Sequence, residues 1–207
     1  LVGLFEMSDP RESRGSTVTA RELLDRGAVQ VEGALAGQPT VQGRLMDAIG
    51  RVYRQLGVFD QSEALLARAL RLRESTAAGP SDDVADTLAE LGEVAREKGD
   101  YAEGEALHRR ALEIRRALHG ETDDTVAFSL NGIGLALDQQ GRYDESEEML
   151  RGAIAMWRQV RPAGDPQVAV GLNNLGQMLR RRARYADAEP VLKEALDIRR
   201  AAFKTDH

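Results

Sequence analysis

Residues 168–176, with the sequence VAVGLNNLG, decide the fold, because parts of this stretch recur at a fixed interval along the chain. The Val-Ala pair at 168 also stands at 126 and at 84, and each step is 42 residues. Four further columns of glycine, aromatic or small residues repeat at this step: Gly50, Gly92, Gly134 and Gly176; Phe59, Tyr101, Tyr143 and Tyr185; Ala69, Ala111, Ala153 and Ala195; Ser62, Gly104, Ser146 and Ala188. Agreement in five columns establishes an internal repeat, which fixes the architecture before any other feature.

Each copy predicts two helices, which we call helix A and helix B. We expect helix A at 42–57, 84–99, 126–141 and 168–183, and helix B at 59–75, 101–118, 143–160 and 185–203. In the third B helix, Met149, Ile154 and Trp157 form an apolar stripe at helical spacing. One helix pair cannot cover both of its apolar faces, so successive pairs are expected to stack.

The ends of helix A carry their own signals. Glycines 57, 99 and 141 stand where helix A must stop, because glycine tolerates the left-handed conformation at a helix C-terminus. Asp82, Asp123 and Asp165 place carboxylates near the positive N-terminal end of the next helix A. The repeated glycine at position 92 or 134 removes a side chain where helix A must approach helix B closely.

The chain therefore predicts an all-α fold divided by its period. The expected divisions are an N-terminal helical cap at 1–41 and repeats at 42–83, 84–125, 126–167 and 168–207. In the cap, residues 17–36 predict a B-type helix with a stripe from Leu23 to Leu35, and residues 1–7 are its candidate, degenerate partner. Residues 1–7 are too short for a signal peptide, and the chain is interpreted as a segment of something longer.

Composition excludes several classes of function. A net charge of −6 argues against non-specific nucleic-acid binding, which needs a basic surface. The chain has no cysteine, which removes disulfides, thiol nucleophiles and cysteine-ligated metals, and which is compatible with a cytoplasmic location. No apolar run approaches the length of a membrane span, so no membrane insertion of this segment is expected.

No catalytic motif is present, and we predict neither an enzyme nor a cofactor. The chain lacks a phosphate loop, a Gly-x-Ser-x-Gly elbow and a dinucleotide fingerprint. His108 is expected to be a packed, hydrogen-bonded residue, and an imidazolium at His119 would be favoured by the end of its helix. Neither has a second ligand at metal-binding spacing. The acidic pair Glu147-Glu148 is expected on a solvated face.

The pattern Leu-Gly, then Tyr, then a small residue, then Ala-Leu resembles the tetratricopeptide repeat. The 42-residue period is similar to that of the kinesin light chain variety, and residues 168–176 with 185–190 (YADAEP) match it best. The resemblance covers about residues 42–203. It implies a right-handed α-solenoid of antiparallel helix pairs whose concave surface, lined by helix A, binds proteins or peptides.

The N-terminal residues resemble another setting. Residues 1–10 (LVGLFEMSDP) and 19–28 (TARELLDRGA) look like the region after the kinase domain in bacterial serine/threonine protein kinases that carry tetratricopeptide tails. That resemblance implies a signalling parent protein, although the chain holds no kinase motif.

The family places the concave residues at fixed offsets from the repeated glycine, and these offsets share one helical face. The residues that this predicts for peptide binding are Arg44, Asp47, Arg51, Arg54, Asp86, Glu93, Arg96, Phe128, Asn131, Leu135, Asn173, Gln177 and Arg180. The arginines at the N-terminal end would attract an acidic part of a ligand, and Phe128 and Leu135 an apolar side chain. Asn131 and Asn173 would pair with an extended peptide backbone.

The leading prediction is a protein-interaction scaffold that binds an extended, acidic and partly apolar peptide. Two alternatives stay open. The chain could be the regulatory or sensor arm of a larger signalling protein such as a kinase, or a self-association module that uses an exposed end of the stack. A monomer or weak homo-oligomer is expected.

Overall fold

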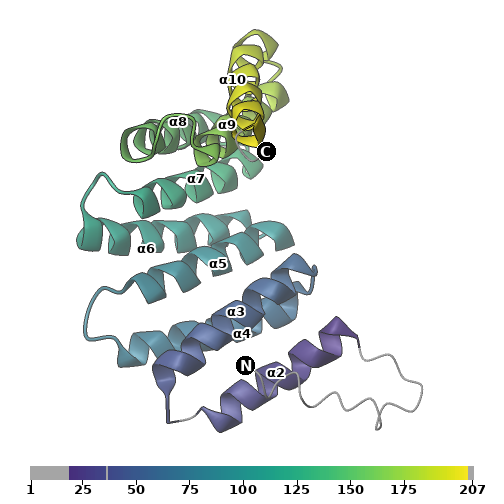
Figure 1. The fold of residues 1–207 in the computed structure, drawn as a ribbon, viewed down its shortest axis with the longest axis vertical. Helices are drawn as coiled ribbons and strands as arrows, with labels where there is room; N and C mark the ends of the chain where they lie inside the picture. The colour runs from purple at the N-terminus through teal and green to yellow at the C-terminus, as the bar shows by residue number, and fades with distance from the viewer. Residues whose placement is uncertain (1–18, 36, 205–207) are drawn as a thin grey trace. The chain divides into compact units, whose positions relative to one another are not determined.

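The computed structural model describes residues 19–35 and 37–204, and every regular element in these ranges is an α-helix (Figure 1). The helices are α2 (Ala20–Ala34), α3 (Pro39–Gln55), α4 (Phe59–Thr76), α5 (Asp82–Lys98), α6 (Tyr101–His119), α7 (Asp124–Gln139), α8 (Tyr143–Val160), α9 (Pro166–Arg181) and α10 (Tyr185–Lys204). Four A–B pairs follow α2, and each helix packs on its partner within the pair. The all-α prediction is confirmed for the described part of the chain.

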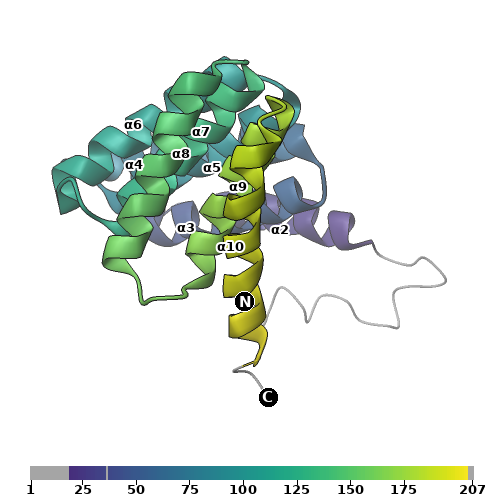
Figure 2. The same ribbon diagram turned by 90° about the horizontal axis from the view of Figure 1, so that it is seen from above.

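The chain forms two compact units, residues 1–77 and residues 78–207. In the first unit, α2 packs on α3, and α3 packs on α4. In the second unit, the six helices α5 to α10 form three pairs stacked in chain order, as Figures 1 and 2 show.

The A helices begin and end earlier than expected, and local chemistry explains both shifts. Pro39 and Pro166 begin their helices because proline suits the first turn. Asp123 and Asp165 cap α7 and α9. Their side chains accept hydrogen bonds from the backbone N–H groups of Thr125 and Gln167, both at 2.8 Å. At the other end, Gly99 adopts φ 92° and ends α5 in the left-handed conformation.

The predicted close approach of helix A and helix B is present. A Cβ added to Gly134 would lie 2.8 Å from Cγ of Leu150, which precedes Ala153 by one turn. Leu66 fills the same place against Gly50 in the first unit. The small residue at the start of helix B has its own role, because Ser146 Oγ donates a hydrogen bond to the Gly134 carbonyl at 2.7 Å.

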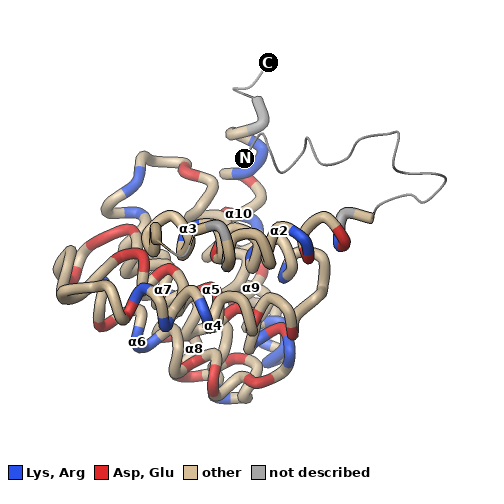
Figure 3. Tube along the Cα trace, turned by 90° about the horizontal axis from the view of Figure 1, so that it is seen from below, with Lys and Arg blue, Asp and Glu red and all other residues tan. Residues whose placement is uncertain are grey.

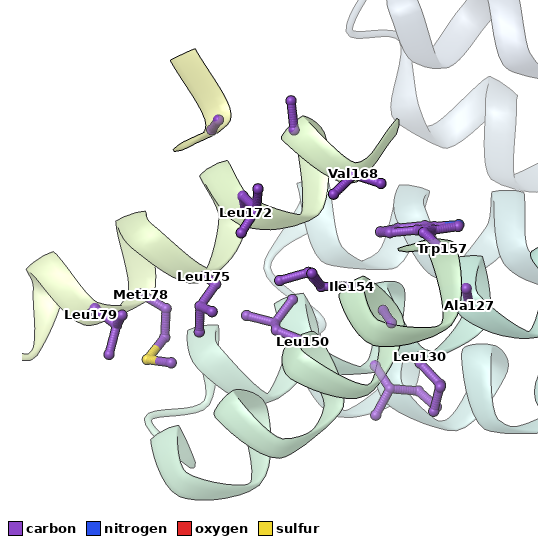
Figure 4. Close-up of a cluster of buried hydrophobic side chains, with 14 of the residues drawn as sticks. Ala127, Leu130, Leu150, Ile154, Trp157, Val168, Leu172, Leu175, Met178 and Leu179 are labelled. Atoms are coloured by element: carbon purple, nitrogen blue, oxygen red, sulfur yellow. The ribbon is translucent and has the colours of Figure 1, made fainter. Parts of the chain in front are cut away.

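The core of the second unit lies between its stacked pairs (Figure 4). Trp157, Leu150 and Leu175 are buried in it, and the side chain of Trp157 has no exposed surface. A Cβ on Gly171 would lie 2.8 Å from Trp157 Cζ3, so this glycine lets α9 approach the tryptophan of α8. Burial of each such side chain contributes roughly 1.5–3 kcal/mol.

In the first unit, the predicted B-type helix in the cap is α2. Thr19 and Glu22 form a reciprocal capping box at its start. Tyr53 Oη of α3 donates a hydrogen bond to Asp25 Oδ1 at 2.5 Å and ties the two helices together. The expected partner segment, residues 1–7, and the first part of the kinase-tail resemblance lie outside the described residues.

None of the helices in the described ranges combines the length with the apolar composition that crossing a membrane requires.

Candidate functional site

The A helices of the second unit present one shared surface. Helix α5 contacts α7, and α7 contacts α9. We use the name A-helix face for the following exposed and half-buried residues of these three helices: Asp86, Ala89, Glu93, Arg96, Phe128, Asn131, Leu135, Val170, Asn173, Asn174, Gln177 and Arg180. Positive and negative positions are interspersed along the helices (Figure 3), and most charged groups on this face contact an oppositely charged neighbour.

The A-helix face carries an exposed apolar pair in the N-terminal halves of α7 and α9. Phe128 of α7 is 39% exposed and Val170 of α9 is 37% exposed, although both belong to helices whose other faces are buried. They occupy equivalent positions in neighbouring repeats, 42 residues apart. The Phe128 ring is held edge-on to Trp157, with ring centroids 5.3 Å apart, and the Arg161 guanidinium lies 5.7 Å from its centroid. The exposed ring is therefore fixed in place.

Side-chain amides follow this apolar pair one turn later along α7 and α9. Asn174 Nδ2 donates a hydrogen bond to Asn131 Oδ1 at 2.9 Å, which joins α9 to α7. From the sequence we expected Asn131 and Asn173, at equivalent positions of neighbouring repeats, to bind a peptide backbone together. The sequence analysis did not single out Asn174, which is the residue that contacts Asn131. Asn173 and Gln177 are half-buried, and Arg180 Nη1 donates to Gln177 Oε1 at 3.3 Å. Each of these side-chain amides has hydrogen-bond donors and acceptors that these contacts do not use.

The α5 side of the face is charged. Arg96 Nη2 lies 2.8 Å from Glu93 Oε2, and His108 Nε2 lies 3.4 Å from Glu93 Oε1. Burial would raise the pKa of Glu93, but His108 and Arg96 outweigh it and hold that pKa at about 2. Asp86 accepts from the buried Arg115 at 2.7 Å. These contacts fix the side chains that α5 contributes.

Asp47, which the sequence analysis placed on the concave face, is buried instead, and so is Asp138. Asp47 of α3 is 3% exposed and pairs with the buried Arg73 of α4. Asp138 of α7 is likewise 3% exposed and pairs with Arg181 of α9. A buried carboxylate needs such a partner, so these two residues tie helices together and do not line a surface.

Three of the five predicted arginines belong to the first compact unit. Arg44 and Arg51 are exposed on α3, and Arg54 is half-buried there. They are therefore not part of the A-helix face, which belongs to helices of the second unit.

The expectation for His108 is half correct. The ring is buried at 3% exposure, but neither of its nitrogens has a hydrogen-bond partner within the described structure. It fits between two helices because a Cβ on Gly92 or on Gly132 would lie 2.8 or 2.5 Å from the ring. Its polar contact is with Glu93, whose Oε1 lies 3.4 Å from Nε2.

Two other polar predictions have definite outcomes. The pKa of His119 is raised by its hydrogen bond to Asp82, with Nε2 and Oδ1 2.7 Å apart, so the charged form is favoured as expected. Glu147 is not on a solvated face, since its side chain is 17% exposed and pairs with Arg184 at 2.6 Å. No group of three histidine and acidic side chains in the described part of the chain is arranged to hold a metal ion.

Stacked antiparallel helix pairs with a shared A-helix face define a helical-repeat protein. A model of the tetratricopeptide repeat family matches residues 41–101, 83–159 and 137–201. These matches span most of the chain, and the chain belongs to the tetratricopeptide repeat family. A search of curated proteins finds no significant match.

Solved structures share the fold at low sequence identity. BtubC (BKLC) from P. vanneervenii is 21% identical, with a TM-score of 0.75 over 96% of this chain and 79% of its own. A putative kinesin light chain repeat protein from Podosopora anserina is 17% identical, with a TM-score of 0.69 over 98% of this chain and 96% of its own. A Rap protein in complex with competence and sporulation factor is 14% identical, with a TM-score of 0.72 over 86% of this chain and 48% of its own. The repeat fold is consistent with a protein-interaction scaffold.

Proposed function

We propose that the chain is a protein-interaction scaffold and that the A-helix face of the second unit binds an extended segment of a partner protein. The observation that carries the proposal is the exposed apolar pair, Phe128 and Val170, held at equivalent positions on neighbouring helices. Exposed apolar residues that gather beside polar groups mark interaction surfaces more often than scattered ones do.

The chemistry of this face selects a ligand with three features. An apolar side chain would cover Phe128 and Val170, and burying it contributes about 25 cal/mol per Å² of apolar surface removed from water. The peptide backbone would bond to the amides of Asn173 and Gln177, which accept and donate without reading sequence. An acidic group would pair with the exposed Arg180, whose guanidinium suits a carboxylate.

A structural neighbour supports this choice of ligand class. The Rap protein named above, which shares the fold over part of its length, was solved in complex with competence and sporulation factor. The fold alone does not assign a function, and the proposal here rests on the residues of this chain.

A matched pair of substitutions tests the proposal. Val170 on the A-helix face is 37% exposed, and Val160 at the end of α8 is 38% exposed. Peptides selected from a random display library on the wild-type protein serve as the ligand. We expect Val170→Glu to weaken their binding at least tenfold in isothermal titration, because it places an unpaired charge on the apolar pair, and Val160→Glu to leave it unchanged. Equal affinity for wild type and Val170→Glu would refute the proposal.

A further inference from the structure

The stripe of residues that α9 contributes to the A-helix face changes its chemistry along the helix. Its residues follow steps of three, four and three, so they lie on one side of α9: Val170, Asn173, Gln177 and Arg180. The stripe runs from an apolar side chain near the start of the helix, over two amides, to a guanidinium in the last turn. A ligand that lies along α9 meets these groups in this order.

Arg180 differs from the other charged residues of the A-helix face because it has no oppositely charged partner in the described part of the chain. Arg96 pairs with Glu93 at 2.8 Å, and Asp86 pairs with Arg115 at 2.7 Å. The exposed guanidinium of Arg180 donates instead to a neutral side-chain amide one turn earlier, at 3.3 Å. The charge of Arg180 is therefore available to a ligand.

Helix α7 does not offer a second charge beside it. Asp138, which stands 42 residues before Arg180, is buried at 3% exposure and pairs with Arg181. The other residues that α7 contributes to the A-helix face are uncharged. On α7 and α9, an acidic group of a ligand is therefore stabilised near the end of α9 and not elsewhere on the face.

Helix geometry fixes the distance between the apolar and the charged end of this stripe. Val170 and Arg180 are ten residues apart. At a rise of about 1.5 Å per residue, they are about 15 Å apart along the helix axis. An extended chain advances about 3.3 Å per residue and turns alternate side chains to opposite sides. Ligand side chains that face α9 are thus two, four or six residues apart and span about 7, 13 or 20 Å, so a separation of four fits best.

We propose that the A-helix face recognises an apolar residue and an aspartate or glutamate placed four residues apart in an extended segment of the partner. This inference rests on the function proposed above and adds the spacing that the ligand must have. The apolar side chain covers Phe128 and Val170, and the side-chain carboxylate binds the Arg180 guanidinium, whose planar fork suits both carboxylate oxygens. The segment continues beyond the acidic residue.

A series of synthetic peptides tests the spacing. Each peptide has blocked ends and carries one leucine and one glutamate, separated by two to six positions in a serine and threonine spacer, in either order. In the order that binds more tightly, we expect a separation of four to give about fivefold higher affinity than three or five, measured by fluorescence anisotropy, because an odd separation turns the carboxylate away from α9. Equal affinity across the series, a maximum at another separation, or no binding by any peptide overturns the proposal.

Two matched variants test the role of Arg180. Arg180→Gln should lower the affinity of the peptide with a separation of four to that of the peptides with three or five. Arg200→Gln, at an exposed arginine of α10, should leave the preference intact. Circular dichroism checks that both variants keep their helices. A preference for four that survives Arg180→Gln overturns the proposal, and so does tighter binding of a peptide whose only carboxylate is its free C-terminus.

The spacing and the binding face can fail separately. Val170→Glu should weaken both the library-selected peptides described above and the synthetic peptide with a separation of four. If Val170→Glu weakens the selected peptides while the synthetic series shows no preference for four, the face is correct and the spacing is wrong. If it weakens neither, the proposed function fails and the inference fails with it.

Discussion

At the scale of single residues, the repeat depends on where side chains are missing. Gly134 leaves room for Leu150, and Gly92 and Gly132 leave room for His108 between them. Gly152 of α8 differs, because the nearest atom to an added Cβ there is Leu130 Cδ1 at 3.8 Å, an ordinary contact distance. Glycine is therefore required by packing at some positions of the repeat and not at others.

We expect Gly134→Ala and Gly152→Ala to change stability in opposite directions. At Gly134 the new methyl group forces Leu150 and the α8 backbone to move, and overpacking of this kind costs about 1–3 kcal/mol. At Gly152 alanine fits, and it favours the helix by about 1 kcal/mol relative to glycine. Thermal melts followed by circular dichroism measure both effects. If Gly134→Ala melted above the wild type, the close helix contact would be wrong.

The Glu93 ion pair predicts a pH dependence. The folded pKa of Glu93 is about 2, below its ordinary value of 4.5, so its stabilising effect is complete above pH 4.5 and is lost as pH falls towards 2. Glu93→Gln removes this contribution. We expect the melting temperatures of wild type and Glu93→Gln to converge between pH 7 and pH 3. A difference that stays constant across this range would show that Glu93 is not held by His108 and Arg96.

At the scale of helices, periodicity predicts which elements exist and which residues are buried in each. The aromatic residues at 59, 101, 143 and 185 begin their helices as expected, and the glycines at 57, 99 and 141 have positive φ. The starts of helix A were predicted too late, because α7 and α9 begin directly after the Asp123 and Asp165 caps, before the Val-Ala column. The sequence of one helix also does not identify the residues that it packs against, which is why Asp47 was expected on the concave surface and lies buried against Arg73.

Because the helix pairs are stacked, we expect truncation of the chain to disturb only the neighbouring pair. Deleting residues 168–207 removes Gly171 and the rest of α9 that packs against Trp157, the only tryptophan in the chain. We expect the emission of Trp157 to shift to longer wavelength while α5 to α8 stay helical, because each repeat depends mainly on its neighbours. Loss of all helical signal in the truncated chain would mean that the stack folds as one indivisible unit.

At the scale of the whole molecule, the A-helix face of the second unit, with the exposed Phe128 and Val170, is proposed to bind a partner segment. Most other charged side chains between the pairs, such as Glu105 and Glu147, already contact the neighbouring pair and are used to hold the stack together.

Site-specific photo-cross-linking tests the central claim, which is that the partner lies on the A-helix face. A photoreactive amino acid is placed at Gln177, half-buried on α9, or at Ala155, exposed on helix B of the preceding pair, and a selected peptide is added. We expect the peptide to be captured from position 177 and not from position 155. Capture from position 155 with none from position 177 would contradict the account.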